Sequence, residues 1–239
     1  KHDNQTLWDN NQYKFASSLS VADRVRLHLV ALSVPLFSQG VPFIHLGSDI
    51  LRSKSMQRDS YDSGDWFNAV DFSYQDNNWN KGLPRADKDG DNWPLIRRII
   101  VDPQAKPGAA DIVAAKRRFL ELLKIRSDSV LFQLDSAREV KRRLQFHNTG
   151  PEQQPGVIAF SLADGPRDGR DLDRRYSSLM VVINASDRPV RLPGADGYEL
   201  HPVLKGSVDP ISRQAKVTSG EFEVPAFTTI VFAQPQTYR

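Results

Sequence analysis

The stretch SVADRVRLHLVALSVPLFSQGVPFIHLG, residues 20–47, decides the fold class. Ser20 is followed three residues later by Asp23, as in a helix capping box, and apolar residues then recur with helical spacing up to a terminating Gly40. The apolar run VPFIHLG, residues 41–47, has the length of a strand that is buried on both faces. A helix followed by such a strand predicts an α/β unit with a parallel sheet.

Downstream of this unit the chain loses its periodicity and then recovers it. Residues 48–108 are rich in Asp, Asn, Ser, Gly, Trp and Tyr and predict a long loop, which in a compact domain is usually functional. Residues 109–126 predict a second amphipathic helix, with Ile112, Ala115 and Phe119 on one face.

The last hundred residues have a different character. They contain short β-prone runs separated by turn residues, which predict an antiparallel β-sandwich, and a charged surface loop at 165–175. The runs are REVKRRLQFHN, GVIAFSLAD, SLMVVINAS, YELHPVL, AKVTSGEFEVP and TTIVFAQ. The fold class is therefore α/β plus all-β. Because one helix–strand–helix unit cannot close a barrel or cover a sheet, we expect the chain to belong to a larger protein.

Composition excludes several classes of protein. The 239 residues are 39% hydrophobic and 26% charged, as in ordinary globular proteins, and contain no apolar stretch of the roughly 20 residues that span a membrane. Zero cysteines exclude disulfides, thiolate metal sites and a cysteine nucleophile. The net charge of +3 comes from basic runs interleaved with apolar residues, which favours solvated faces over nucleic-acid binding.

Three motifs carry a resemblance to a known family. KHDNQTLWD at 1–9, SYDSGDWFN at 60–68 and DNWPLI at 91–96 resemble, in order and spacing, the pullulanase-type debranching enzymes and limit dextrinases of glycoside hydrolase family 13, in the α-amylase clan. The resemblance covers nearly the whole chain. It implies that residues 1–130 are the C-terminal portion of a (β/α)8 TIM barrel, from the end of strand 7 to helix 8. Residues 131–239 would then form the C-terminal β-sandwich.

The resemblance also implies an activity for the complete enzyme. That activity is hydrolysis of α-1,6-glucosidic linkages in pullulan, amylopectin and limit dextrins, with retention at the anomeric carbon. The nucleophile and the general acid would lie upstream of Lys1, so the segment alone is expected to be inactive. Asp3 matches the third acid of the family, which stabilises the transition state, and His2 would donate to the same sugar.

Three further residues are implied to bind substrate. Asn4 adjoins the His-Asp pair, and Arg58 and Asp91 match loop positions that hold glucose units remote from the cleaved bond. Arg and Asp can together fork onto adjacent sugar hydroxyls. A structural salt bridge between Arg58 and Asp59 is an equally good interpretation.

Aromatic and histidine side chains offer weaker signals. Trp66, Trp79 and Trp93 are candidates for stacking on sugar rings, although packing beneath the loop is favoured for Trp66 and Trp93. His28 and His45 are expected to be packed, satisfied core histidines.

Two short patterns suggest ligands or modification without further support. DKDGDN at 87–92 partly resembles a calcium loop, but Asn92 and Arg98 stand where an EF-hand has Gly and Glu, so no metal is predicted there. No cofactor is implied for this segment, and calcium is left open for the complete enzyme. NAS at 184–186 is a formal glycosylation sequon.

The alternative function is a non-catalytic carbohydrate-binding or scaffold module. The β-rich half suits it in architecture, but all four tryptophans precede residue 94. The expected partners are an α-glucan and the missing N-terminal part of the same enzyme, with no nucleic acid and no transmembrane segment. Location stays open, although the bacterial type favours a secreted or cell-surface enzyme.

Overall fold

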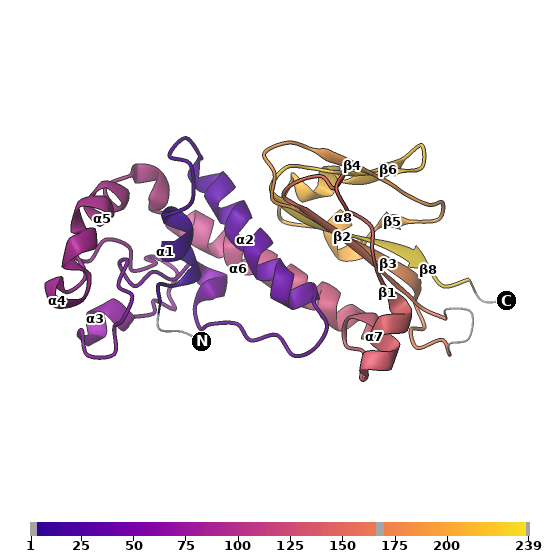
Figure 1. The fold of residues 1–239 in the computed structure, drawn as a ribbon, viewed down its shortest axis with the longest axis horizontal. Helices are drawn as coiled ribbons and strands as arrows, with labels where there is room; N and C mark the ends of the chain where they lie inside the picture. Colours follow the sequence, from indigo (N-terminus) through magenta and orange to yellow (C-terminus); the bar gives the residue numbers. More distant parts are fainter. Residues whose placement is uncertain (1–3, 166–169, 238–239) are drawn as a thin grey trace. The chain divides into compact units, whose positions relative to one another are not determined.

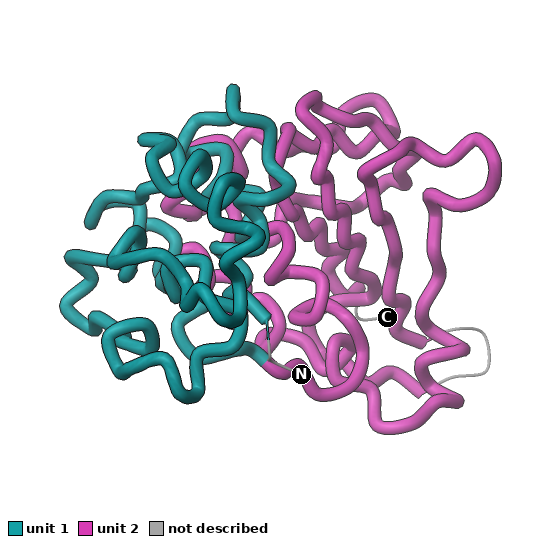
Figure 2. The backbone as a smooth tube through the Cα atoms, turned by 60° about the vertical axis from the view of Figure 1, so that its left-hand side comes forward, with its two compact units in different colours: residues 1–28, 44–117 teal, residues 29–43, 118–239 magenta. Residues whose placement is uncertain are grey.

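The computed structural model of the chain describes residues 4–165 and 170–237 (Figure 1). The chain forms two compact units (Figure 2). Unit 1 contains residues 1–28 and 44–117, and unit 2 contains residues 29–43 and 118–239. None of the helices in the described ranges is both long and apolar enough to span a lipid bilayer.

Unit 1 is built from helices and loops. Its helices are α1 (Leu7–Gln12), the start of α2 (Val21–Phe37), α3 (Asp65–Asn68), α4 (Ala86–Asp89), α5 (Trp93–Ile100) and the first half of α6 (Ala109–Asp128), with 3-10 turns at Ser48–Ile50, Gly90–Asn92 and Pro103–Ala105.

The predicted capping box of the first long helix is confirmed. Ser20 Oγ accepts from the backbone N–H of Asp23 at 3.2 Å and donates to the Asp23 carboxylate at 2.7 Å. Helix α2 ends at Phe37, and Gly40 has a φ of +89°, the left-handed region that a chain leaving a helix often enters.

The predicted buried strand at 41–47 is wrong for the described chain. The segment has no strand conformation, and Val41, Phe43 and Leu46 are 82%, 91% and 61% exposed. A strand buried on both faces exists only between neighbouring strands that pair with its N–H and C=O groups. Among the described residues no strand pairs with this segment, so its apolar side chains stay in solvent.

The predicted loop 48–108 contains more helix than expected. Helix α5 has Pro94 in its first turn, where no intrahelical N–H is needed, and buries Ile96 and Ile100 four residues apart. Two turns are too short to give a sustained period in the sequence. The predicted second helix is confirmed as α6, with Ile112, Ala115 and Phe119 buried.

Unit 2 contains two antiparallel sheets, as the β-prone runs indicate. The five-stranded sheet has the order β1-β2-β3-β8-β5, and the three-stranded sheet has the order β4-β7-β6. The Phe222 ring on β7 lies 4.8 Å from the Phe232 ring on β8, so side chains of the two sheets meet in the core. The strands are β1 (Leu144–Phe146), β2 (Val157–Ala163), β3 (Tyr176–Asn184), β4 (Val190–Pro193), β5 (Glu199–Leu200), β6 (Lys216–Thr218), β7 (Glu221–Val224) and β8 (Thr228–Pro235).

Two of the predicted β-prone runs are partly helical. Residues 137–143 form α7 (Ala137–Arg143), capped by Ser136, and only Leu144–Phe146 of that run is strand. The helix has a local cause in the Ser136 cap and the ion pair of Glu139 with Arg143 at 2.8 Å. It also has a tertiary one, because Arg143 is buried and its guanidinium pairs with the buried carboxylate of Asp164 at 2.8 Å. In the run 198–204, helix α8 (Pro202–Lys205) follows the two-residue strand β5.

The second half of α6 is bonded to the sheets of unit 2. Arg118 is buried and donates to Ser212 Oγ at 2.9 Å and to the carbonyl oxygen of Thr229 at 3.3 Å. Arg126 donates to the carbonyl oxygens of Leu36 and Gly40. These bonds explain why the compact units divide within α6.

Candidate functional site

The segment that follows the HDN motif is fixed in the core of unit 1. His2 and Asp3 lie outside the described residues, and Asn4 is exposed. Helix α1 begins three residues later, with Thr6 Oγ1 accepting from the backbone N–H of Asp9 at 3.2 Å. Trp8 is fully buried and donates its indole N–H to the carbonyl oxygen of Ala105 at 3.2 Å.

Asp9 connects this helix to the loop that precedes Arg58. Its fully buried carboxylate accepts from Ser53 Oγ at 2.5 Å and from the backbone N–H groups of Lys54 and Met56 at 2.8 and 3.3 Å. No motif in the sequence predicts a role for Asp9. In the sequence, Asp9 is distinguished only as a carboxylate next to Trp8, in the helix that begins three residues after the HDN triplet.

The Asp9 carboxylate holds a backbone that would otherwise be unfavourable. Ser55 and Met56 have φ values of +50° and +67°, a region that residues with a Cβ seldom enter. Burial raises the pKa of Asp9 to about 6, although hydrogen bonds from Ser53, Lys54 and Met56 act in the opposite direction. The loop 51–57 is therefore positioned by a carboxylate that burial makes harder to ionise.

Arg58 and Asp59 do not form a salt bridge. Asp59 pairs instead with Lys88 at 3.0 Å, and Lys88 also pairs with Asp62 at 2.9 Å. Arg58 is exposed and has no ion-pair partner among the residues that the structure describes. The alternative of a structural salt bridge is therefore wrong.

Arg58 and Asp91 both lie on the surface of unit 1. The Lys88 ion pairs join the segment after Arg58 to helix α4, and exposed Asp91 follows α4 in the next 3-10 turn. Burial raises the pKa of Tyr13, the nearby carboxylate of Asp89 raises it further, and the positive charge of Arg58 lowers it. Arg58 and the α4 segment therefore both lie within electrostatic range of Tyr13.

The acidic residues at 87–91 do not form a calcium loop. Asp87 is bonded to the Arg85 guanidinium at 3.0 and 2.7 Å, and buried Asp89 accepts from Asn92 Nδ2 at 3.1 Å. No group of three or more acidic, His or Cys side chains in the described part of the chain is arranged to hold a metal ion. These residues do not fit a bound calcium.

The tryptophans differ from the sequence-based prediction. Trp79 is 3% exposed and donates to the carbonyl oxygen of Ile100 at 3.3 Å, so stacking of a sugar on Trp79 is excluded. Trp93 is half-buried and donates to the carbonyl oxygen of Pro84 at 2.8 Å. Trp66 is 48% exposed, so the loop covers only part of it.

Two other predicted features are decided by burial. His28 is packed in the core, as expected, and burial lowers its pKa to about 4. It is only half satisfied, because its Nε2 lies 2.7 Å from the carbonyl oxygen of Ser48 while its buried Nδ1 has no hydrogen-bond partner among the described residues. His45 is exposed, so its predicted burial is wrong. Asn184 of the sequon is fully buried and donates to the carbonyl oxygens of Arg188 and Pro225, which leaves no amide for a glycan.

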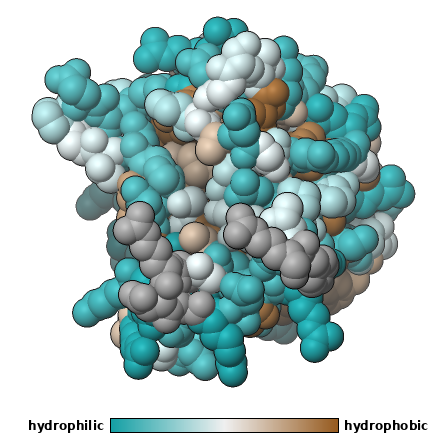
Figure 3. Space-filling view, turned by 90° about the vertical axis from the view of Figure 1, so that its right-hand side faces the viewer, coloured by the Kyte–Doolittle hydropathy of each residue, from teal (hydrophilic) through white to brown (hydrophobic). Residues whose placement is uncertain are grey.

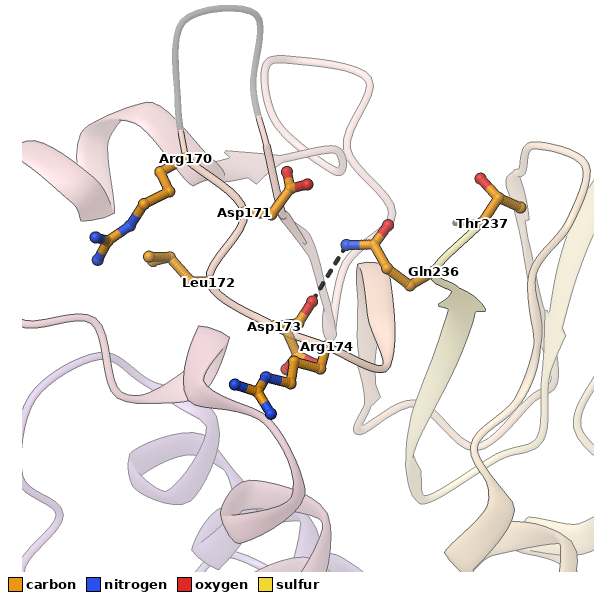
Figure 4. Close-up of a pocket in the computed structure, with 7 residues that line it drawn as sticks. All are labelled: Arg170, Asp171, Leu172, Asp173, Arg174, Gln236 and Thr237. Carbon is orange, nitrogen blue, oxygen red and sulfur yellow. Dashed lines mark hydrogen bonds between the residues drawn. The ribbon is translucent and has the colours of Figure 1, made fainter. Parts of the chain in front are cut away.

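Unit 2 has a polar pocket and, separately, an apolar one whose lining includes Phe37, Phe146 and Phe160. The volume of the polar pocket is about 620 Å³, and most of its lining residues are charged or polar; the side chains of Arg170 and Arg174 point away from Gln236 (Figure 4). Gln236 Nε2 donates to the carbonyl oxygen of Asp173 at 3.2 Å across the pocket. The face in Figure 3 is mainly hydrophilic, with scattered apolar side chains. No aromatic ring is among the lining residues, which are Arg170, Asp171, Leu172, Asp173, Arg174, Gln236 and Thr237.

Comparison with known proteins places the chain in a family. Residues 74–235, about two thirds of the chain, match the family described as alpha-1,6-glucosidases, pullulanase-type, C-terminal. Chloroplastic pullulanase 1 of Arabidopsis thaliana is 46% identical over 98% of this chain and 25% of its own length. The pullulanase of Klebsiella pneumoniae is 46% identical over 99% of this chain and 22% of its own length. The chain belongs to the pullulanase-type α-1,6-glucosidases.

Solved pullulanases share the fold of this pullulanase-type chain. The crystal structure of apo pullulanase from Klebsiella pneumoniae superposes with a TM-score of 0.93 and 37% identity, covering 100% of this chain and 26% of that one. A maltotriose complex of PulA from the same organism has the same TM-score and identity. The chain spans about a quarter of the length of the curated relatives it matches. The resemblance predicted from the three motifs is confirmed.

Proposed function

We propose that this chain is part of a debranching glycoside hydrolase that cleaves α-1,6-glucosidic linkages in pullulan, amylopectin and limit dextrins. The observation that carries the proposal is the identity of 46% to two pullulanases over almost the whole chain. The substrate of the complete enzyme would be an α-glucan, held partly by this chain and partly by the rest of the enzyme.

The proposed architecture goes beyond the two compact units. Residues 1–130 would complete a (β/α)8 barrel, and residues 131–239 would form a β-sandwich. The exposed apolar run at 41–46 supports the barrel, because neighbouring barrel strands would cover it and pair with its backbone. The contact between Phe222 and Phe232 of the two sheets supports the sandwich.

The proposed chemistry is retaining hydrolysis. Two carboxyl groups about 5–5.5 Å apart would act as nucleophile and general acid, and both would lie on the rest of the enzyme. Asp3 would contribute a negative charge that binds the sugar more tightly as it becomes an oxocarbenium ion, and His2 would donate to the same sugar. Interactions that strengthen in the transition state raise kcat rather than only lowering KM.

The rest of the proposed site is remote from the cleaved bond. Asn4 would line the same subsite as Asp3, while Arg58 and Asp91 would bind the hydroxyls of more distant glucose units. The exposure of Arg58 and Asp91 supports this role, as does the carboxylate of Asp9, which joins the helix after the motif to the loop before Arg58. Binding energy from such remote contacts also helps to orient the reacting sugar.

The substitution Asp3→Asn in the complete enzyme tests the proposal. The change keeps the size of the side chain but removes the charge, so kcat on pullulan should fall roughly a hundred- to a thousand-fold with little change in KM. Asp49→Asn, at a half-buried carboxylate in the 3-10 turn at 48–50, is the matched control and should keep wild-type kinetics. Near-normal turnover by Asp3→Asn would contradict the proposed role.

The carbohydrate-binding module is tested with the 239-residue chain itself. Binding of maltooligosaccharides that survives Asp3→Asn and is lost with Arg170→Ala in the polar pocket would favour that alternative. The absence of an aromatic ring among the pocket's described lining residues favours the enzyme instead.

A further inference from the structure

Trp66 is the most exposed of the four tryptophans. It lies on the short helix α3 and is 48% exposed, whereas Trp8 and Trp79 are 0% and 3% exposed. A tryptophan at the surface leaves a large apolar ring in water, and this residue type is commonly buried or used in binding. The contacts around Trp66 indicate whether its ring serves packing or binding.

The indole ring is held in one orientation from three sides. The ring of Phe67, which is itself 2% exposed, is stacked on it with centroids 3.8 Å apart. At one end of the indole, a Cβ on Gly82 would lie 2.8 Å from Trp66 Cη2, and at the other end a Cβ on Gly64 would lie 3.0 Å from Nε1. A Cβ on Gly82 would therefore displace the ring, and one on Gly64 would require it to shift by a few tenths of an ångström.

The two loops that contain these glycines are fastened to each other. Arg85 follows Gly82 by three residues, and its guanidinium contacts the carboxylate of Asp62 at 3.0 Å and the carbonyl oxygen of the same residue at 3.1 Å. Asn78 Nδ2 donates to the carbonyl oxygen of Trp66 at 2.9 Å, which fixes the backbone of α3. The two loops and Phe67 therefore hold the indole ring in this orientation without a ligand.

The exposed part of this ring suits a sugar better than a protein surface. Charged groups belong to the same two segments, because Asp62, four residues before Trp66, pairs with Arg85 and Lys88. The C–H face of a pyranose matches an indole face, while its hydroxyls need polar partners at the rim. The indole N–H has no acceptor among the described residues and can donate to such a hydroxyl.

We infer that Trp66 forms an outer subsite for an α-glucan chain, separate from the contacts of Arg58 and Asp91. This inference rests on the proposed function, because it assumes that the chain contributes to a glucan-binding surface. Preformed geometry means that little side-chain freedom is lost on binding. The subsite would act only on chains long enough to reach it, so it affects KM for long substrates and not the chemical step.

The test uses the complete enzyme and two branched maltooligosaccharides, one with a short and one with a long main chain. Trp66→Ala should raise KM for the long substrate roughly three- to tenfold and leave the short substrate and kcat unchanged. Trp66→Phe should retain most of the affinity because a ring remains. Gly82→Ala, which displaces the ring without removing it, should resemble Trp66→Ala for the long substrate.

Phe72→Ala is the matched control, since Phe72 is an exposed aromatic residue of the same loop region and is 66% exposed. It should leave both substrates unaffected. Wild-type KM for the long substrate in Trp66→Ala would overturn the inference. An equal loss for both substrates would also overturn it, because that result indicates a structural role.

A separate readout distinguishes failure of the inference from failure of the proposed function. Binding of linear maltoheptaose to the complete enzyme, followed by tryptophan fluorescence, does not require hydrolysis. If the wild-type enzyme cleaves no α-1,6 linkage, the proposed function fails. Weaker maltoheptaose binding by Trp66→Ala would still support the subsite, and unchanged binding would overturn it.

Discussion

At the scale of the residue, burial shifts the pKa values of titratable side chains. Asp9 and His201 are both fully buried, yet their environments shift their pKa values in opposite directions. Burial disfavours the charged form of either group, so it raises the pKa of Asp9 to about 6 and lowers the pKa of His201 to about 4. Neither shift can be anticipated from the neighbouring sequence.

We predict that His201 makes unit 2 sensitive to acid. The unfolded imidazole has a pKa of 6.5 and the folded one about 4, so the unfolded state binds more protons between these values. The contribution of neutral His201 to the free energy of unfolding of unit 2 is therefore fully present above pH 6.5. It is lost as the pH falls toward 4, which lowers that free energy by up to about 3 kcal/mol. His201→Gln should flatten this part of the pH profile, measured as the melting temperature between pH 4.5 and 7.

The control is Thr149→Gln, at an exposed residue of the same unit that has no titratable group. It should keep the wild-type fall in melting temperature. An identical acid profile in wild type and His201→Gln would show that other groups cause the acid sensitivity.

At the scale of the element, single side chains connect segments that are far apart in sequence. Arg143 fixes helix α7 to Asp164, and Asp9 fixes α1 to the loop at 51–57. The capping box of α2 is visible in the sequence because Ser20 and Asp23 are local to each other. The bonds of Asp9 to Ser53 and of Arg143 to Asp164 are invisible there because these partners lie more than 20 residues away. The ion pair of Arg143 with Glu139, in contrast, is local.

We predict that Asp9→Asn loosens the loop at 51–57 in the complete enzyme. The variant presents an amide to two backbone N–H groups, and an unsatisfied buried donor costs about 1–3 kcal/mol. Amide hydrogen exchange of peptides covering residues 51–57 should accelerate by roughly ten- to a hundred-fold, because local opening controls the rate. Mass spectrometry of deuterated peptides measures this change.

Asp59→Asn is the matched control for the loop. Asp59 is partly exposed and pairs with Lys88 at the surface, where such pairs contribute little to stability. Exchange in the loop should therefore stay close to that of the wild type. Equal exchange in Asp9→Asn and Asp59→Asn would show that the Asp9 bonds do not hold the loop.

At the scale of the whole molecule, the apolar segment 41–46 is exposed to solvent. Val41, Phe43 and Leu46 are each more than 60% exposed. Covering a side chain of this kind is worth about 1.5–3 kcal/mol, so three neighbouring ones drive association. In the proposed barrel the rest of the enzyme would cover them.

We predict that the 239-residue chain on its own self-associates and hydrolyses neither α-1,6 nor α-1,4 glucans. Replacing Val41, Phe43 and Leu46 together by Ser should shift the chain to monomer in sedimentation or size-exclusion experiments. Tyr61→Ser, at a residue that is 85% exposed and lies outside the segment, should not. A wild-type chain that is monomeric at tens of micromolar would contradict the role of this segment, and turnover of pullulan by the purified chain would contradict the proposed division of the active site.

Local sequence patterns were sufficient for the two long helices, the capping box at Ser20, the antiparallel strands and the family, whose motifs lie in order along the chain. Short elements such as α5 and α7 were missed because two turns of helix give too weak a period, although α7 has local signals in the Ser136 cap and the i,i+4 ion pair of Glu139 with Arg143. Arg58 and Asp91 were assigned to the candidate site only through the family resemblance. Their roles remain predictions, as do those of His2, Asp3 and Asn4.

The amino-acid sequence by itself determined which segments repeat with helical or strand period and to which family the chain belongs, since both depend on residues close together or on ordered motifs. Only the tertiary structure decided that Asp59 pairs with Lys88, that Trp79 and Asn184 are buried, and that Trp66 is half exposed and seated between Gly64 and Gly82. The physical reason is that burial and pairing are properties of surroundings assembled from segments far apart in the chain, and one residue type can be core, anchor or binding surface according to what folds against it.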